Sequence, residues 1–187
     1  MSPVRVGQRT VFGHRAAIVG ATVGDLCEIG NGAILLPGSR LGSGCILGEG
    51  TLLPPGAGVK IIGDSHGPVR IGSRVQILEN TVLHLLPDNE LIIEDDAVIG
   101  PGAMIHGCPI GRGSIVEPGA IVCDGSVVGA ESVVRAGACV KQRDRFGDRS
   151  ILDGFPARLA GTLTDPPAMP GWALPLDAVA ALRRVQR

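Results

Sequence analysis

Aliphatic residues return at every sixth position along most of the chain, and this spacing belongs neither to an amphipathic helix nor to a simple strand. A glycine often follows the aliphatic residue, as in IGNGAI, LGSGCI and IGRGSI. The repeated positions are Val6, Phe12, Ile18; Val23, Ile29, Leu35, Leu41, Leu47, Leu53, Val59; Ile71, Ile77, Leu83; Ile93, Ile99, Ile105; and Ile110, Val116, Val122, Val128, Val134, Val140. A fixed repeat outweighs local propensity, so the pattern predicts a solenoid.

Six residues are enough for one short strand and one corner. The aliphatic side chain would point inward, and Gly, Asn or Asp would accept the unusual backbone angles of the corner. Three hexads, about 18 residues, would close one triangular coil, and coils would stack at the spacing of paired strands, about 4.8 Å. We therefore expect an all-β solenoid of hexapeptide repeats, with residues 1–163 as its domain.

Two interruptions break the repeat. The sequence KIIGDSHGPVR lies between Val59 and Ile71, and the step from Leu83 to Ile93 contains LLPDNE, which makes it four residues longer than a hexad. Loops on a rigid scaffold are where binding and catalytic residues gather. We expect the functional site near these two insertions.

The repeat ends after Val140. Residues 164–187 are predicted to form a Pro-rich connector and a C-terminal α-helix, whose arginines near the chain end suit the helix dipole. The helix would pack along the solenoid or against a neighbouring subunit. A basic recognition helix is the alternative.

The amino-acid composition limits the classes of protein to which the chain could belong. Hydrophobic residues make up 44% of the chain but aromatic residues only 2%, which fits a narrow aliphatic interior. A net charge of −1 gives no attraction to nucleic acid or to an anionic membrane. No apolar run resembles a signal region or a membrane span, so a cytoplasmic protein is expected. The five cysteines form no CxxC pair, and four of them are predicted to be reduced packing residues: Cys27, Cys45, Cys123 and Cys139.

His84 and His106 are the candidate functional residues. Each directly follows an inward aliphatic residue of the repeat, and they are separated by one coil plus the four inserted residues. We expect the two imidazoles to stack on consecutive coils. Ordinary outward residues, or histidines satisfied at a subunit interface, are the alternatives. His14 is expected to be a surface residue.

Three segments resemble the γ-class carbonic anhydrase-like family of hexapeptide-repeat proteins: VRIGSRVQILENTVLH (69–84), IGPGAMIHGCPIGRGSIVEPGAIVCDGSVV (99–128) and GFPAR (154–158). The resemblance implies a left-handed parallel β-helix and a homotrimer with a zinc site at each subunit interface. Three histidines would bind the zinc there, two from one chain and one from its neighbour.

The family site is incomplete in this sequence. His84 and His106 match the two histidines that one chain supplies, but the third falls on Pro101, which has no lone pair for a metal. The family's glutamine falls on Leu78 and its arginine on Ile62. Hydration of carbon dioxide by the family mechanism is therefore not expected.

Four functions stay open. His84 and His106 could bind zinc or another transition metal with a substitute ligand such as His66, Glu79 or Asp64. They could instead perform metal-free acid–base chemistry, with Glu79 or Asp64 orienting an imidazole. A trimeric scaffold or binding protein without catalysis is the third possibility. The fourth is acyl transfer from coenzyme A or a carrier protein.

We favour an enzyme that binds a small carbonyl or carboxyl compound at the subunit interface. Its expected catalytic residues are His84, His106, Glu79, Asp64 and Asn80. These residues are equally compatible with a bound metal and with a site that uses no cofactor. Cys108 is a further candidate nucleophile, although its HGC setting favours structural packing.

Overall fold

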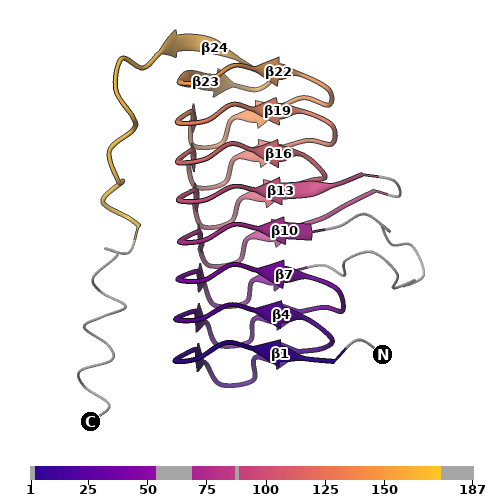
Figure 1. Cartoon of the computed structure of the whole chain (residues 1–187). Helices are drawn as coiled ribbons and strands as arrows, with labels where there is room; N and C mark the ends of the chain where they lie inside the picture. Colours follow the sequence, from indigo (N-terminus) through magenta and orange to yellow (C-terminus); the bar gives the residue numbers. More distant parts are fainter. Residues whose placement is uncertain (1–2, 54–68, 87–88, 174–187) are drawn as a thin grey trace.

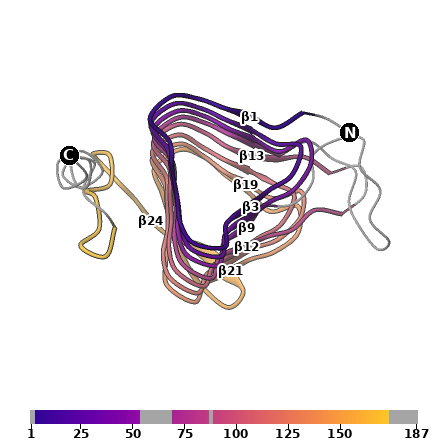
Figure 2. The same ribbon diagram turned by 90° about the horizontal axis from the view of Figure 1, so that it is seen from below.

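The computed structural model describes residues 3–53, 69–86 and 89–173. These residues form a triangular prism of stacked coils, seen from the side in Figure 1 and along its axis in Figure 2. Each coil contributes one short strand to each of three parallel sheets, here called face 1, face 2 and face 3. Strands β1 to β21 make seven such coils within the described residues. The all-β solenoid predicted from the hexad is confirmed, with the architecture of a left-handed parallel β-helix.

The strands follow the repeat closely. Face 1 consists of β1 (Arg5–Val6), β4 (Thr22–Val23), β7 (Arg40–Leu41), β10 (Val69–Ile71), β13 (Leu91–Ile93), β16 (Pro109–Ile110), β19 (Val127–Val128) and β22 (Arg145–Phe146). Face 2 consists of β2 (Val11–Phe12), β5 (Glu28–Ile29), β8 (Ile46–Leu47), β11 (Gln76–Ile77), β14 (Val98–Ile99), β17 (Ile115–Val116), β20 (Val133–Val134), β23 (Ser150–Gly154) and β24 (Ala157–Thr162). Face 3 consists of β3 (Ala17–Ile18), β6 (Ile34–Leu35), β9 (Leu52–Leu53), β12 (Val82–Leu83), β15 (Met104–Ile105), β18 (Ile121–Val122) and β21 (Cys139–Val140).

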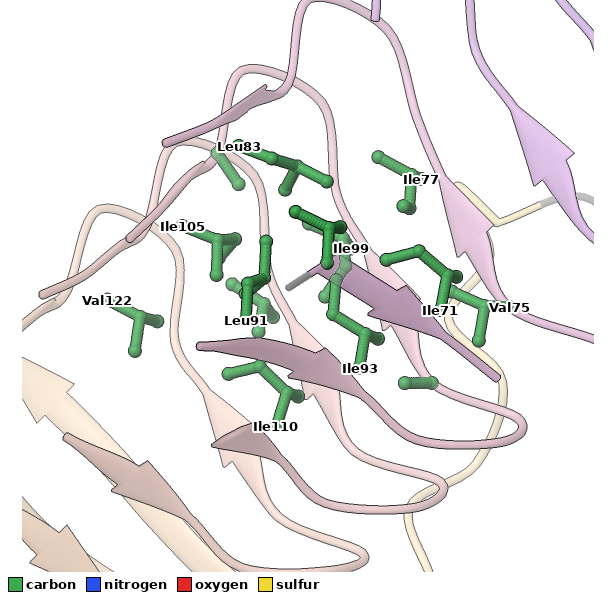
Figure 3. Close-up of a cluster of buried hydrophobic side chains, with 14 of the residues drawn as sticks. Ile71, Val75, Ile77, Leu83, Leu91, Ile93, Ile99, Ile105, Ile110 and Val122 are labelled. Carbon is green, nitrogen blue, oxygen red and sulfur yellow. The ribbon is translucent and has the colours of Figure 1, made fainter. Parts of the chain in front are cut away.

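The core is a column of aliphatic side chains inside the prism. Figure 3 shows that the repeat residues of three faces, among them Ile77, Leu83 and Ile93, point to this common interior. The side chains of Ile77, Leu83 and Ile93 are at most 1% exposed. Burial of these aliphatic groups is the main stabilising contribution, and it needs no aromatic residue because the interior is narrow.

Two kinds of glycine permit the stacking. Gly111 follows the inward Ile110, and a Cβ atom there would lie 2.4 Å from the backbone nitrogen of Ala130 on the next coil. Gly119 instead has a positive φ of 70°, and a Cβ atom at this position would meet no atom within 4 Å. The first glycine allows the close approach of two coils, and the second allows a left-handed corner.

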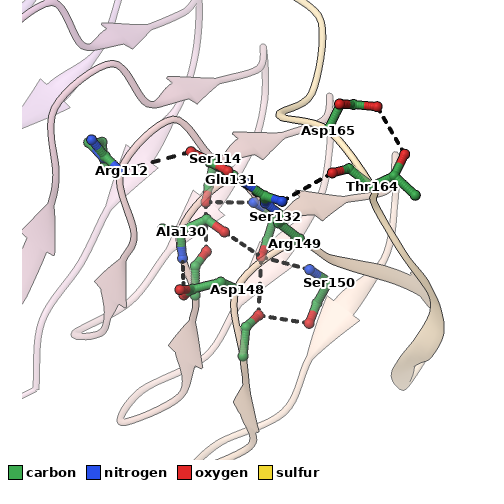
Figure 4. A network of polar contacts seen from close by, with 12 residues as sticks. Arg112, Ser114, Ala130, Glu131, Ser132, Asp148, Arg149, Ser150, Thr164 and Asp165 are labelled. Carbon is green, nitrogen blue, oxygen red and sulfur yellow. Dashed lines mark hydrogen bonds and ion pairs between the residues drawn. The ribbon is translucent and has the colours of Figure 1, made fainter.

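The last coil ends in an antiparallel pair, β23 with β24, which was not part of the repeat prediction. Serine and carboxylate side chains brace the neighbouring corners, as Figure 4 shows. Ser150 donates its backbone N–H to Ser132 Oγ at 3.0 Å, and Ala130 donates its N–H to Asp148 Oδ1 at 2.8 Å. Arg149 reaches both Glu131 (2.8 Å) and the carbonyl oxygen of Thr164 (3.0 Å), so it ties the exit of the chain to this corner.

After β24 the chain returns along face 2. Leu163, Trp172 and Ala173 pack against three outward side chains of face 2, those of Val98, Ile115 and Val133. The expected C-terminal helix falls on residues 174–187, outside the described residues. Within residues 3–53, 69–86 and 89–173 no helix is present, so none there could span a membrane.

Candidate functional site

The two histidines occupy the corner that follows face 3, called here the histidine corner and defined by His84 and His106. Strands β12 and β15 pair with Leu83 opposite Ile105, which places His84 and His106 on consecutive coils. The backbone N–H of His84 donates to the carbonyl oxygen of Ile105 at 2.8 Å. The stacking expected from the repeat is therefore observed.

The imidazoles face each other through the same ring atom. Nδ1 of His84 lies 3.4 Å from Nδ1 of His106, with ring centroids 5.3 Å apart and ring planes at 76°. A hydrogen bond between two nitrogens needs one donor and one acceptor. Only one of the two Nδ1 atoms therefore carries the shared hydrogen.

Asp124 and Asn89 complete the cluster, and neither was predicted from the sequence. Oδ2 of Asp124 lies 3.5 Å from Nδ1 of His106. Oδ1 of the same carboxylate accepts hydrogen bonds from Asn89 Nδ2 at 2.9 Å and from the backbone N–H of Gly107 at 3.2 Å. Asn89 belongs to the predicted LLPDNE insertion, whereas the signal for Asp124 was an acidic residue one coil after His106.

The surroundings of His106 favour its neutral form. Burial lowers the pKa of His106 below its ordinary value, Asp124 opposes this shift, and the neighbouring His84 adds to it. The His106 side chain is 23% exposed, so it remains within reach of solvent. A partly exposed imidazole that is neutral near pH 7 can accept a proton.

Other predicted catalytic residues lie elsewhere in the chain. Glu79 and Asn80 are exposed at the corner between faces 2 and 3, before β12, whereas His84 follows β12. Among the described residues, neither has a hydrogen bond or ion pair with an imidazole. Glu79 instead lines a hollow with Glu28 and Glu49. Asp64 and His66 lie outside the described residues, as does Ile62.

Pro101 occupies the same corner as Glu79, one coil further along. The N–H of Gly102 donates to the carbonyl oxygen of Glu79, and the N–H of Gly119 donates to that of Pro101 at 2.9 Å. Strand β15 separates Pro101 from the histidine corner of its own chain. A side chain at position 101 could therefore meet a histidine pair only in another copy of the protein.

The described residues do not fit a three-histidine zinc centre. The Nδ1–Nδ1 distance of 3.4 Å is close to the spacing of about 3.3 Å between two nitrogen ligands of tetrahedral zinc. Position 101, however, offers no donor atom. Within the part of the chain that the structure describes, no three His, Cys, Asp or Glu side chains are grouped as metal ligands.

Cys108 lies inside the prism, although it is only two residues from His106. Its side chain is fully buried, and burial raises the pKa of the thiol to about 12, with a hydrogen bond to Ser126 acting in the opposite direction. A buried protonated thiol is a poor nucleophile. These surroundings support the packing role over the catalytic one.

Apolar side chains flank the histidine corner on face 3. Ile34, Val82 and Met104 point outward from β6, β12 and β15, and each is 38% exposed. Val82 and Met104 are direct neighbours in the sheet. The histidines therefore stand beside an exposed apolar stripe, made of Ile34, Val82 and Met104.

Comparisons with known sequences agree with the repeat. A family described as "Hexapeptide repeat of succinyl-transferase" matches residues 3–37 and 90–123. Gamma carbonic anhydrase 1, mitochondrial, of Arabidopsis thaliana is 31% identical over 103 residues, which cover 52% of this chain and 38% of the relative. The carnitine operon protein CaiE of Escherichia coli is 33% identical over 100 residues, which cover 54% and 51%. The chain thus spans about half or less of the length of these relatives.

Solved structures share the fold at low sequence identity. The UDP-N-acetylglucosamine acyltransferase of Campylobacter jejuni has a TM-score of 0.66 at 16% identity, covering 98% of this chain and 71% of the other. A putative acetyltransferase of Bacillus cereus has a TM-score of 0.59 at 20% identity, covering 98% and 90%. Fold and repeat together identify the chain as a left-handed β-helix of hexapeptide repeats, and a γ-class carbonic anhydrase and CaiE are among the sequences to which it is similar.

Proposed function

We propose that the protein is an enzyme in which the neutral imidazole of His106 acts as a general base on a small carbonyl or carboxyl compound. One observation supports this most directly: Nδ1 of His106 lies 3.4 Å from Nδ1 of His84 and 3.5 Å from Oδ2 of Asp124. Because Pro101 stands where the family's third histidine would be, the proposal involves no three-histidine zinc centre and no hydration of carbon dioxide.

The histidine pair suits proton transfer. A general base near neutral pH contributes about 10²- to 10⁴-fold to a rate. A proton taken up by His106 can pass to His84 across the Nδ1–Nδ1 contact, since one nitrogen donates and the other accepts. His84 is thus the proton partner of the base.

We also propose a cytoplasmic homotrimer that binds its small-molecule ligand between subunits. The exposed apolar stripe on face 3 supports an interface beside the histidines. Face 2 is already covered in its C-terminal half by residues 163–173 of the same chain. In such a trimer, Glu79 and Asn80, at the far edge of face 3, would approach the histidine corner of a neighbouring copy.

The proposed base is tested with 4-nitrophenyl acetate, an activated carboxyl ester whose cleavage is seen by absorbance. We expect His106→Ala to lower turnover about 100-fold or more, and His84→Ala to lower it less. His14→Ala is the matched control, because His14 is exposed on the first coil, and its turnover should equal that of the unaltered protein. Unchanged turnover in both His84→Ala and His106→Ala would show that the general base does not lie at the histidine corner.

Metal dependence is measured on the same assay, using protein purified without a histidine-rich tag. After dialysis against a chelator, we expect turnover to stay within about twofold, with no zinc or iron retained by elemental analysis. Loss of turnover that added Zn²⁺ restores, and that His84→Ala abolishes, would instead assign a metal whose remaining ligand comes from outside the described residues or from a second copy.

Acyl transfer from coenzyme A is the second candidate function. The matched repeat carries the description of a succinyl-transferase, and a neutral imidazole can also deprotonate an acceptor amine or hydroxyl. Thiol release from succinyl-CoA or acetyl-CoA that requires an amine acceptor and disappears in His106→Ala would favour this function. Inactivity of the unaltered protein on the esters and on both thioesters would favour a non-catalytic trimer.

A further inference from the structure

We propose that Asp124 is a positioning residue for His106: its carboxylate accepts the Nδ1–H of the imidazole, so that Nε2 is the atom that takes up the proton. Asn89 and the backbone N–H of Gly107 hold the carboxylate in place. The inference rests on the proposed role of His106 as a base. It assigns to this base a tautomer and an orienting partner.

The first support is the burial of Asp124. The residue is 8% exposed, and a buried carboxylate needs hydrogen-bond donors around it. Oδ1 receives Asn89 Nδ2 at 2.9 Å and the Gly107 N–H at 3.2 Å. Oδ2 faces Nδ1 of His106 at 3.5 Å, which is its only ion-pair contact among the described residues.

The second support comes from what each atom can donate. An ionised carboxylate only accepts hydrogen bonds, so a lone pair on Nδ1 of His106 pointing at Oδ2 would be repelled. Nδ1 therefore carries the hydrogen, which it shares between Oδ2 of Asp124 and Nδ1 of His84, both of which act as acceptors. In a neutral imidazole with hydrogen on Nδ1, the lone pair is on Nε2.

The third support is the convergence of three segments on this carboxylate. Asn89 comes from the insertion between β12 and β13, Gly107 from the link between β15 and β16, and Asp124 from the corner before β19. Gly107 leaves the room that Asn89 occupies, since a Cβ atom at position 107 would lie 2.5 Å from Cβ of Asn89.

Carboxylates brace other corners of the solenoid as well, so a purely structural role must be separated from this one. Asp148 accepts the N–H of Ala130 at 2.8 Å, and Asp25 accepts that of Gln8 at 2.7 Å. Both of these residues are exposed, whereas Asp124 is buried. Of these three carboxylates, Asp124 is the one that turns its second oxygen towards a histidine. Asp148→Asn is therefore the matched control for Asp124→Asn.

The test is the side-chain tautomer of His106, measured by long-range ¹H–¹⁵N correlation on full-length ¹⁵N-labelled protein near pH 8. The signals are assigned by their loss in His106→Ala. We expect the Nδ1–H tautomer in the unaltered protein and in Asp148→Asn. In Asp124→Asn the amide can donate to Nδ1, so the population should move to the Nε2–H tautomer. Asn89→Ala should move it in the same direction by a smaller amount, and this variant keeps the carboxylate if Asp124→Asn does not fold.

Kinetics supply a second readout on 4-nitrophenyl acetate. Loss of a group that orients a metal-bound histidine costs about 10- to 100-fold in activity. By analogy we expect kcat for Asp124→Asn to fall by this factor, with KM nearly unchanged. The inference is overturned if the unaltered protein has the Nε2–H tautomer. It is also overturned if the tautomer populations of the unaltered protein, Asp124→Asn and Asn89→Ala are the same. The tautomer is observed without any substrate, so failure of the positioning role is distinguishable from failure of the proposed function.

Discussion

The thiol of Cys108 and the imidazole of His106 are two positions apart in the chain but lie in opposite surroundings. His106 projects outward at the histidine corner, and Cys108 points into the aliphatic core. Burial therefore acts on both groups with opposite consequences for chemistry: it keeps the thiol protonated and the imidazole neutral, by raising the pKa of the first and lowering the pKa of the second. The first group becomes inert and the second becomes a base.

A substitution of Cys108 tests this difference. Cys108→Ala should keep the turnover of 4-nitrophenyl acetate within about twofold, while the lost core contacts lower the free energy of unfolding by about 1 kcal/mol. Turnover and urea unfolding are measured on the same preparation. A large loss of turnover in a variant that unfolds like the unaltered protein would make Cys108 the nucleophile and contradict its packing role.

The sequence predicted some of the individual residues of the candidate site. His84 and His106 follow inward aliphatic residues, so their stacking follows from the repeat alone. Residues after the aliphatic positions of faces 1 and 2 are often glycines, whereas after face 3 they are side chains, namely Val19, Leu36, His84, His106, Cys123 and Lys141. Asp124 could not be placed against His106 from spacing, because the short link from Ile105 to Ile110 puts Cys123, and not Asp124, opposite His106. That shortening shifts the register so that Ile105 pairs with Val122.

Among the strands and corners, the two kinds of glycine have different consequences for stability. Gly111→Ala puts a methyl group 2.4 Å from a backbone nitrogen of the adjacent coil, and neither coil can yield without losing hydrogen bonds. Gly119→Ala meets no atom within 4 Å and suffers only the strain of its positive φ. We expect losses of about 3 kcal/mol for the first and about 1 kcal/mol for the second. Urea unfolding measures both, and equal losses would show that coil contact is not the reason for glycine after the aliphatic residue.

The repeat also explains which elements were predictable. Hexad spacing identified the buried residues from Val23 to Leu47 and from Ile71 to Val140, because each coil there has the same contacts as its neighbours. Val6 and Phe12, on the first coil, are exposed, and Val59 lies outside the described residues. The β23–β24 pair and the return of residues 163–173 along face 2 follow no repeat. These segments are placed by particular contacts, such as Arg149 with Thr164 and Trp172 in the cluster with Val98 and Ile115. Such contacts cannot be inferred from spacing.

For the molecule as a whole, one chain provides only the two edges of a possible site. The histidine corner and the corner with Glu79 and Asn80 lie on opposite edges of face 3. A neighbouring copy on this face would bring the two edges together and cover Val82 and Met104. Whether Glu79 and Asn80 take part in the reaction therefore depends on assembly. The contact between two copies cannot be inferred from the spacing of residues in a single chain.

The proposed interface is tested by placing a charge in the apolar stripe. Val82 is 38% exposed on face 3, and Val11 is 39% exposed on face 2, so Val11→Lys is a matched control for Val82→Lys. Sedimentation should show a trimer of the 19.1 kDa chain for the unaltered protein and for Val11→Lys. Val82→Lys should dissociate at least about tenfold more readily, because a buried unpaired ammonium costs several kcal/mol. A Val82→Lys trimer as tight as the control would show that face 3 is not the contact between copies, and Glu79 and Asn80 would then have no route to the histidines.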